Sequence, residues 1–356
     1  MKELEFAQII KSIGGTAYRV GGSIRNQLLS IPVNDNDYCV VGTLPYRFAT
    51  AFPSAVQVGQ SFPVFLLEID GEKCEIAFAR TEKKTGTGHK GFEVDFSSDI
   101  TIEEDLARRD FTMNAIAYDI IGQQIIDPFN GTKDIHNKII RATSEAFKED
   151  PLRVYRAARF AAQLGFDIDS QTIEMFTDSS LQEDMKTLSV ERVYVELEKA
   201  LKSPHPETFF QVLKEGSCLQ VHFKEIYDLI DVPQPIAHHP EGCAYNHTMQ
   251  VLAEMAKQTD KVERRFTALV HDLGKARTPK ELLPKHHGHE QAGIAPLEEM
   301  SLRLRLPGKW FQAAHFGILN HGRFHRVHEM REVKIVDMLK KKKRSPLGIE
   351  GLAQLG

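Results

Sequence analysis

The stretch Tyr18–Thr43, YRVGGSIRNQLLSIPVNDNDYCVVGT, decides the fold of the amino-terminal part of the chain. It predicts a strand that ends at Gly21-Gly22, a short helix over Ile24–Leu29 and, after a proline break, a second strand opened by Asp35. Ser23 is expected to cap the helix by accepting a hydrogen bond from a backbone N–H group. Strand, glycine turn, helix and strand therefore follow one another within a few residues.

Two carboxylates stand at the start of the second strand. Side chains alternate between the faces of a strand, so Asp35 and Asp37 share one face. Hard oxygen ligands at this spacing suit Mg²⁺, and the Gly21-Gly22 backbone can approach a phosphate closely. A lone DxD or a lone GG is usually a plain turn. Their joint presence predicts a metal and nucleotide site.

These residues carry a resemblance to a known family. Gly21-Gly22-x-x-Arg25 followed by Asp35-x-Asp37 resembles the head of the nucleotidyltransferases that include DNA polymerase β, and more narrowly the bacterial class II CCA-adding tRNA nucleotidyltransferases. The resemblance implies Asp35 and Asp37 as catalytic Mg²⁺ ligands. It also implies that Gly22 and Arg25 bind the nucleotide. The family usually has aspartate after the arginine, where this chain has Asn26, which we interpret as a support behind the site.

Composition sets the general class. A chain of 356 residues is expected to form two or more domains. The net charge of −4 excludes a global basic field, so any RNA binding must use local patches. Four cysteines without paired spacing fit a reducing compartment. Without a signal-like or membrane-spanning apolar stretch, a cytoplasmic location is expected.

A hairpin is predicted downstream of this stretch. Runs of β-prone residues at Pro63–Ile69 and Lys73–Ala79 flank Asp70-Gly71, which is a strong turn signal. Glu75 stands on the second strand, and the resemblance makes it a third catalytic carboxylate. The alternative is a glutamate that simply faces solvent. The glycine-rich segment Arg80–Gly91 reads as a mobile loop, which in the resembling family helps the switch from C to A addition.

Two arginine motifs follow. The run from Arg108 to Ala115, RRDFTMNA, resembles the RRDxTxNA signature, in which the second arginine, here Arg109, contacts the nucleotide. Without the resemblance it would read as a solvated, ion-paired helix face.

The second motif, EDPLRVYRAAR, places three arginines along one side of a predicted helix. The resemblance to EDxxRxxRxxR implies that Asp150 and Arg153 mimic a template base, because an acceptor and a planar donor fork match the edges shared by cytosine and adenine. Arg156 and Arg159 would hold the base or the phosphates. A solvated basic face is the alternative.

Histidines are concentrated in the last third of the chain, where eleven of the fifteen follow residue 237. His247 and the doublet His271-Asp272 in ALVHDLGK resemble the HD phosphohydrolase superfamily, with a site for Ni²⁺, Mn²⁺ or Co²⁺. The run from His286 to His289 could add ligands. The superfamily pattern also has a later aspartate, for which Asp337 is the nearest candidate, in a context that does not match.

Taken together, the sequence predicts an α+β fold. A polymerase-β-like nucleotidyltransferase head over 1–137 is followed by an all-α neck and body over 138–230 and an α-helical HD domain over 231–356. The resemblance implies addition of C, C and A to tRNA 3′ ends from CTP and ATP, by a monomer or homodimer, with possible phosphohydrolase activity on 2′,3′-cyclic phosphates, 2′-nucleotides or other phosphoesters. A poly(A) polymerase, an HD phosphohydrolase with an RNA-binding head and a non-catalytic tRNA-binding module are the alternatives.

Overall fold

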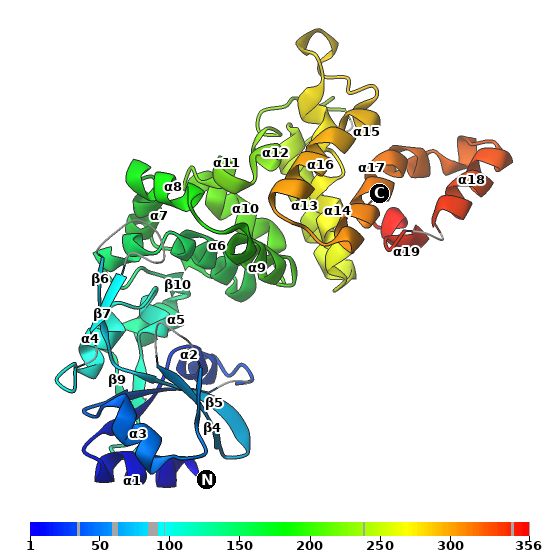
Figure 1. The fold of residues 1–356 in the computed structure, drawn as a ribbon. Coiled ribbons are helices and arrows are strands. Elements are labelled where there is room, and N and C mark those ends of the chain that lie inside the picture. Colours follow the sequence, from blue (N-terminus) through cyan, green and yellow to red (C-terminus); the bar gives the residue numbers. More distant parts are fainter. Residues whose placement is uncertain are drawn as a thin grey trace. The chain divides into compact units, whose positions relative to one another are not determined.

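The computed structural model describes residues 1–33, 36–58, 63–84, 92–95, 97–237, 239–342 and 345–355. The chain divides into a first unit of Met1–Arg153 with Phe166–Thr172 and a second unit of Val154–Gly165 with Ile173–Gly356 (Figure 1). All named strands lie in the first unit, and the described part of the second unit is helical. The α+β fold is therefore confirmed, while the expected boundaries near residues 137 and 230 stay a prediction.

A seven-stranded mixed sheet forms the centre of the first unit, in the order β3-β4-β5-β2-β1-β8-β9. Only β2 and β5 pair in parallel, and the other neighbours are antiparallel. The strands are β1 (Thr16–Val20), β2 (Asp37–Val41), β3 (Val56–Val58), β4 (Val64–Ile69), β5 (Glu72–Phe78), β8 (Ala117–Asp119) and β9 (Gln124–Ile126).

Both faces of this sheet are covered, because the central strands alternate between two apolar clusters. Tyr38 joins a cluster with side chains of α1 (Glu3–Ser12) and α3 (Pro45–Ala51). Its neighbour Cys39 joins a second cluster with side chains of α4 (Ile102–Ala107). This period of two is what a strand buried on both sides requires. It fixes which side of β2 each residue faces.

In this sheet the predicted hairpin agrees with the structure, whereas the predicted start and cap of the helix after Gly21-Gly22 do not. Asp70 and Gly71 both have positive φ, 53° and 84°, and join β4 to β5 as the hairpin signal predicted. The helix α2 runs from Gly22 to Leu28, so it begins two residues earlier and ends one residue earlier than expected. Ser23 is therefore not its cap; its hydroxyl donates to the carbonyl of Val20 at 3.0 Å, so this prediction was wrong.

Short elements complete the first unit. The segment expected as a loop begins with a strand, β6, which pairs antiparallel with β7; residues 85–91 lie outside the described residues. The further elements are β6 (Thr81–Lys84), β7 (Phe92–Asp95), η1 (Thr112–Asn114), α5 (Gly131–Asn137), β10 (Ile139–Ile140), η2 (Glu145–Glu149) and β11 (Asp167–Ile168).

The helix α6 (Leu152–Leu164) begins in the first unit and continues in the second, and α7 (Ser170–Phe176) does the same. The core of the second unit starts with an aromatic cluster in which Tyr155, Phe209 and Phe223 are in mutual ring contact. The remaining elements are α8 (Ser179–Lys186), α9 (Val190–Leu201), α10 (Pro206–Glu215), α11 (Leu219–His222), α12 (Lys224–Tyr227), α13 (Ala244–Gln258), α14 (Val262–Val270), η3 (Leu273–Arg277), η4 (Lys280–Leu282), α15 (His289–Ala292), α16 (Ile294–Arg303), α17 (Gly308–His325), η5 (Val327–Glu329), α18 (Glu332–Lys342) and α19 (Gly348–Ala353).

Among the described residues, no helix has the length and apolar character required to cross a bilayer.

Candidate functional site

The parallel pairing of β2 with β5 brings two carboxylates side by side. Asp37 is the register partner of Glu75, and both residues are exposed. Register partners on neighbouring strands point to the same face of a sheet. Asp35, the other carboxylate of the predicted pair, lies outside the described residues. Glu75 was a candidate third carboxylate on resemblance alone, and the strand register now places it next to Asp37.

The glycine turn faces this pair. Gly21 has φ of 72°, and a Cβ atom built there would lie 3.1 Å from Nη1 of Arg109 and 4.0 Å from Oδ2 of Asp37. A Cβ built at Gly22 would lie 3.5 Å from Nη2 of Arg25. The two glycines therefore keep open a space bordered by Asp37, Arg25 and Arg109. Three residues predicted for nucleotide binding and one predicted for metal binding meet there.

Arg25 is held in place by a chain of amide groups. Its Nη1–H donates to Oδ1 of Asn114 at 2.7 Å, and its Nη2–H and Nε–H donate to Oδ1 of Asn26 at 2.8 and 3.2 Å. Asn114 in turn donates to Oδ1 of Asp110 at 3.0 Å. Asn26, which departs from the resembling family, still provides the acceptor that fixes the guanidinium. The substitution removes a charge and keeps the hydrogen bonds.

Arg109 is fixed by Asp105 of α4. Its Nη2–H donates to Oδ2 of Asp105 at 3.0 Å, and Arg108 pairs with Oδ1 of the same carboxylate. Burial of Asp105 would raise its pKa, but the charges and hydrogen bonds of the two arginines hold that pKa below its usual value. The Nε atom of Arg109 is buried and has no hydrogen-bond partner among the described residues.

Asp150 and Arg153, the predicted base-reading pair, lie in the first unit at the start of α6. Oδ1 of Asp150 accepts a hydrogen bond from the backbone N–H of Leu152 at 3.1 Å. The guanidinium of Arg153 donates to the carbonyl oxygens of Ala146 at 2.8 Å and Arg108 at 2.6 Å. Asp150 thus bonds to the neighbouring backbone, whereas Arg153 bonds both to nearby Ala146 and to the distant segment at Arg108.

Arg156 and Arg159 belong to the second unit. Arg159 is buried, and its Nε–H donates to Oε2 of Glu196 at 2.5 Å, while its guanidinium lies 3.7 Å from the ring centre of Phe160. Arg156 lies 5.7 Å from the same ring. The predicted row of arginines is therefore not uniform, because Arg159 is engaged in a buried ion pair that the spacing in the sequence did not indicate.

A second constellation lies in the second unit around Asp272. Its carboxylate is 1% exposed and has four imidazole Nε2 atoms nearby. His271 and His247 approach Oδ2 at 3.2 and 3.7 Å, whereas His289 and His321 approach Oδ1 at 3.4 and 3.6 Å. The three predicted ligands, His247, His271 and Asp272, are therefore brought together. They line a cavity of about 660 Å³ with His289 and His321.

The electrostatics of this cluster centre on the buried carboxylate of Asp272. Burial opposes ionisation of Asp272, but His271, followed by His289 and His321, holds its pKa well below the usual value. Burial and the neighbouring His271 lower the pKa of His247 to about 4. Burial also works against protonation of His289, yet the neighbouring carboxylate of Asp272 raises its pKa.

The donor set fits a transition metal. Neither carboxylate oxygen of Asp272 accepts a hydrogen bond of good geometry from the described residues, although the Nζ atom of Lys275 lies 2.6 Å from Oδ2. The Nε2 atoms of His289 and His321 face each other at 3.1 Å, which requires a proton or a cation between them. Imidazole nitrogens with one carboxylate are typical ligands of Zn²⁺, Ni²⁺ or Cu²⁺.

Sequence reasoning missed part of this cluster. His321 lies on α17, fifty positions after His271, in a segment without a recognisable motif. Asp337, considered as a final ligand, lies on α18 and lines a different cavity with Arg323, Arg326 and other residues. Helical spacing on α17 would have put His321 on its buried face, which was the only available signal.

Comparisons with known proteins decide the family. The chain is 44% identical over 332 residues to a protein named "Multifunctional CCA protein" from Mannheimia succiniciproducens, which covers 91% of this chain and 78% of that protein. The protein of the same name from Haemophilus influenzae is 44% identical over 330 residues, covering 90% and 78%. This chain belongs to the multifunctional CCA protein family.

Domain and structural matches agree with this membership in the multifunctional CCA protein family. Residues 17–141 match the family described as "Poly A polymerase head domain", and residues 165–229 match "Probable RNA and SrmB-binding site of polymerase A". The crystal structure of the Bacillus stearothermophilus CCA-adding enzyme in complex with CTP is similar, with a TM-score of 0.69 and 26% identity, covering 99% of this chain and 77% of that chain. The Thermotoga maritima CCA-adding enzyme complexed with tRNA shares the fold, with a TM-score of 0.68 and 18% identity, covering 99% and 76%.

Proposed function

We propose that this chain is a tRNA nucleotidyltransferase that adds C, C and A in turn to the 3′ end of tRNA, from CTP and ATP and without a nucleic-acid template. One observation carries the proposal: Asp37 and Glu75 stand side by side, and Asp37 faces a glycine turn bordered by Arg109. The relatives that share 44% of its residues carry the name of this activity. Residues 1–137 would perform the transfer, and residues 138–230 would read the base and bind tRNA.

The reaction forms a bond between the terminal 3′-oxygen of the tRNA and the α-phosphorus of the nucleotide, and releases pyrophosphate. Asp37, together with Asp35, would hold Mg²⁺, because carboxylates near phosphates are its usual ligands. Bound Mg²⁺ would neutralise charge on the triphosphate and make the hydroxyl a better nucleophile. Glu75 adds a third negative charge beside Asp37, which strengthens cation binding at this strand end.

The basic residues have separate tasks in this proposal. Arg25 and Arg109 bind the triphosphate, since both guanidiniums border the open space at Gly21-Gly22. Fixed guanidiniums recognise phosphate oxygens without base information. The backbone of Gly22, at the start of α2, offers N–H groups in the same direction.

Base selection is proposed for Asp150 and Arg153. Cytosine and adenine both present an exocyclic amino donor beside a ring-nitrogen acceptor, which an aspartate and an arginine can match. Arg153 must exchange its bonds to the carbonyls of Ala146 and Arg108 for the base edge. Arg156 and Arg159 would support the helix or contact the nucleotide.

The test uses tRNA transcripts that end before CCA, after C and after CC, each incubated with single nucleotides and with mixtures. The proposal expects two additions with CTP alone and a final A only on the CC-ended transcript. Unlimited addition of A to any end would instead identify a poly(A) polymerase. No addition with any nucleotide would leave only the RNA-binding alternatives.

A second function is favoured by the cluster around Asp272. We propose that residues 231–356 form an HD-type domain in which His247, His271 and Asp272, joined by His289 and His321, bind Ni²⁺ or another divalent transition metal. When bound, such a metal polarises a phosphoryl oxygen or lowers the pKa of a water molecule. Lys275, whose Nζ atom lies 2.5 Å from Oε1 of Gln234 and 2.6 Å from Asp272, could neutralise the phosphate of a phosphoester substrate.

This second function is tested separately from CCA addition. Hydrolysis of a 2′,3′-cyclic nucleotide, a 2′-nucleotide and a general phosphomonoester is measured with Ni²⁺, Co²⁺ and Mn²⁺. His271→Ala and Asp272→Ala should remove the hydrolysis and leave CCA addition unchanged. Hydrolysis that survives both substitutions would show that the cluster is not its site.

A further inference from the structure

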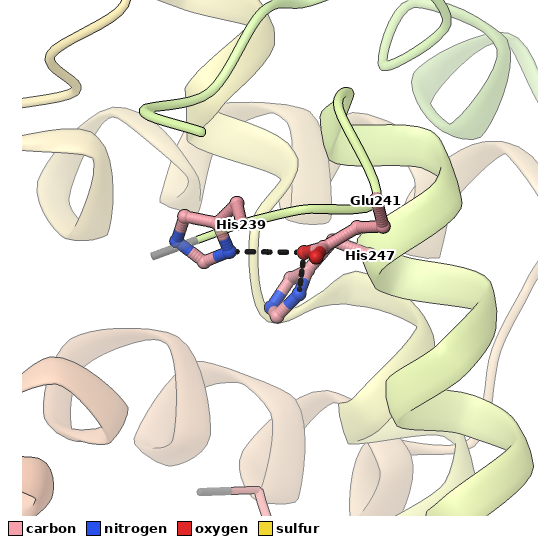
Figure 2. Close-up of side chains that lie close together, drawn as sticks. All are labelled: His239, Glu241 and His247. Carbon is pink, nitrogen blue, oxygen red and sulfur yellow. Dashed lines mark hydrogen bonds and ion pairs between the residues drawn. The ribbon is translucent and has the colours of Figure 1, made fainter. Parts of the chain in front are cut away.

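A carboxylate lies behind one of the four histidines that surround Asp272. Oε1 of Glu241 is 2.7 Å from Nδ1 of His247 and 3.0 Å from Nδ1 of His239 (Figure 2). The Glu241 side chain is 7% exposed, whereas those of His239 and His247 are 25% and 22% exposed. The three side chains form a small cluster at the wall of the cavity that contains Asp272.

Hydrogen-bond chemistry fixes the tautomer of His247. An ionised carboxylate can only accept hydrogen bonds, so the Nδ1 atoms that contact Glu241 must carry the protons. A neutral imidazole with its proton on Nδ1 has its lone pair on Nε2. In His247 this lone pair lies on the atom that is 3.7 Å from Oδ2 of Asp272. Glu241 therefore leaves His247 ready to bind a cation beside Asp272.

The other three histidines also carry a proton on Nδ1, which is held there by main-chain carbonyl groups and not by a carboxylate. Their Nδ1 atoms donate to main-chain carbonyl oxygens: His271 to Ala268 at 2.8 Å, His289 to His286 at 2.8 Å and His321 to Ile318 at 3.0 Å. In the neutral form that can bind a cation, each of the four imidazoles therefore carries its lone pair on Nε2, the atom that lies near Asp272. Among these four, His247 alone makes its Nδ1 hydrogen bond to a side chain; the nearest carboxylate to Nδ1 of His289, that of Glu290, is 3.7 Å away.

The local backbone holds Glu241 in this position. Gly242 adopts φ of 88°, and its N–H donates to the carbonyl of His239 at 3.1 Å, which closes a tight turn around Glu241. Nδ2 of Asn246, in the first turn of α13, donates to the carbonyl of Glu241 at 3.0 Å. The turn and the helix start therefore keep Glu241 and His247 in reach of each other.

The same three residues could be read as a metal site of their own, with Glu241 and two Nδ1 atoms as ligands. That reading conflicts with the cluster around Asp272. A neutral imidazole offers one lone pair, so His247 cannot bind a cation through Nδ1 and another through Nε2 without losing its last proton. The carboxylate–imidazole–metal arrangement is the far commoner use of such a contact.

We propose that Glu241 is a positioning residue that fixes the tautomer and orientation of His247, with His239 holding the carboxylate from its other side. The proposal rests on the second function above, because it assigns a support to that metal site. Such supports raise the basicity of the ligand they contact, and their loss typically costs about 10- to 100-fold in metal affinity.

The test compares Glu241→Ala, Glu241→Gln and Glu254→Ala. Glu254 lines the same cavity from α13 and, among the described residues, pairs only with Lys257, so it is a matched loss of charge without a histidine contact. Co²⁺ binding is measured by calorimetry on the full chain. Glu241→Ala should raise the dissociation constant about 10- to 100-fold, Glu241→Gln should raise it less because an acceptor remains, and Glu254→Ala should leave it unchanged. Equal affinities in all three variants would overturn the proposal.

A second measurement separates positioning from loss of fold. Long-range ¹H–¹⁵N spectra of ¹⁵N-histidine-labelled protein, with and without Zn²⁺, report which nitrogen of His247 carries the proton and which binds metal. The expected result is an Nδ1 proton and metal on Nε2 in the wild type, and mixed tautomers in Glu241→Ala. Metal on Nδ1 of His239 and His247 would overturn the proposal.

The two proposals can fail independently. If the wild type binds neither Co²⁺ nor Zn²⁺, the metal site of the second function is wrong. The metal-free spectra then decide about Glu241. An Nδ1 proton on His247 that is lost only in the Glu241 variants supports the positioning role, while a tautomer that does not depend on Glu241 refutes it.

Discussion

Arg153 donates its Nη2–H to the main-chain carbonyl oxygen of Arg108 at 2.6 Å. Arg108 immediately precedes Arg109, whose guanidinium borders the glycine turn. Arg153 therefore ties the start of α6 to the segment that carries a proposed phosphate ligand. Arg153 could act as this tether or as the proposed reader of the base. A tether affects the incorporation of all nucleotides alike, whereas a base reader affects the selection among them.

Arg153→Ala distinguishes the two tasks. Loss of a bidentate base contact costs about 1–3 kcal/mol of discrimination, which is roughly 5- to 150-fold. As a base reader, the variant should incorporate UTP and GTP more readily relative to CTP. The measurement is single-turnover incorporation of each nucleotide on one tRNA, with Arg109→Ala as a control that should slow all four nucleotides alike. If Arg153→Ala slowed the incorporation of all four nucleotides by the same factor, Arg153 would not read the base and would serve only as the tether to Arg108.

Glu75→Ala tests whether the carboxylate that the β2–β5 register places beside Asp37 takes part in nucleotide addition. Removing this charge beside Asp37 should lower the rate of both CTP and ATP addition by about 10²-fold or more, in the range seen when one electrostatic contact to the transition state is lost. Glu72, the first residue of the same strand, is exposed and provides the control. Glu72→Ala should be as active as the wild type. Asp37→Ala should abolish nucleotide addition and keep tRNA binding. Full activity in Glu75→Ala would show that Glu75 does not belong to the site.

Asn26→Ala should weaken nucleotide binding without changing selectivity. The substitution removes the acceptor of two hydrogen bonds from Arg25, each worth about 0.5–1.5 kcal/mol. A rise in KM of about 5- to 150-fold is expected for CTP and ATP alike. Asn26→Asp keeps the acceptor and should stay within about twofold of the wild type by the same reasoning. A KM that rises for only one nucleotide would contradict the assignment of Arg25 to the triphosphate.

The second unit should lose stability in mild acid because of His222. Burial lowers the pKa of this imidazole to about 4, and the charge of Arg303 contributes to the same effect. Its Nδ1 atom is 2.6 Å from the hydroxyl of Tyr155. Between pH 6.5 and 4 the unfolded chain binds a proton that the folded chain does not, so the free energy of unfolding falls as pH falls, by at most about 3 kcal/mol. Urea unfolding at several pH values measures this loss, and His222→Gln should reduce it. An unchanged pH dependence would mean that other groups cause it.

The sequence predicted the elements of the first unit better than their pairing. The β-prone runs and the Asp70-Gly71 turn predicted the β4–β5 hairpin, because both signals are local. The adjacency of Asp37 and Glu75 depends on a parallel pairing across 38 positions, which no local pattern encodes. The cap by Ser23 was wrong since Gly21, with its positive φ, already starts the helix.

Predictions for the second unit were limited by side chains that meet from distant helices. The HDLGK motif indicated His271 and Asp272, and His247 came with the resemblance. His321 and Glu241 could be found only once α17 and the turn before α13 were placed around Asp272. The same holds for Arg159, whose pairing with Glu196 is not visible from an arginine spacing of three.

The parallel pairing of β2 and β5 has a mechanical consequence. Hydrogen-bonded neighbouring strands stay about 4.8 Å apart whatever the twist of the sheet. Asp37 and Glu75 therefore shift as one rigid body when the sheet flexes, and the distance between their backbones is conserved during such motion. Arg25 and Arg109, on a helix and a connecting segment, are joined to each other by Asn114 instead, whose side-chain oxygen accepts a hydrogen bond from Arg25 at 2.7 Å and whose main-chain oxygen accepts one from Arg109 at 3.5 Å. When this unit flexes, the two arginines would move relative to a pair of carboxylates whose backbone separation does not change. This movement would open or close the space for the nucleotide.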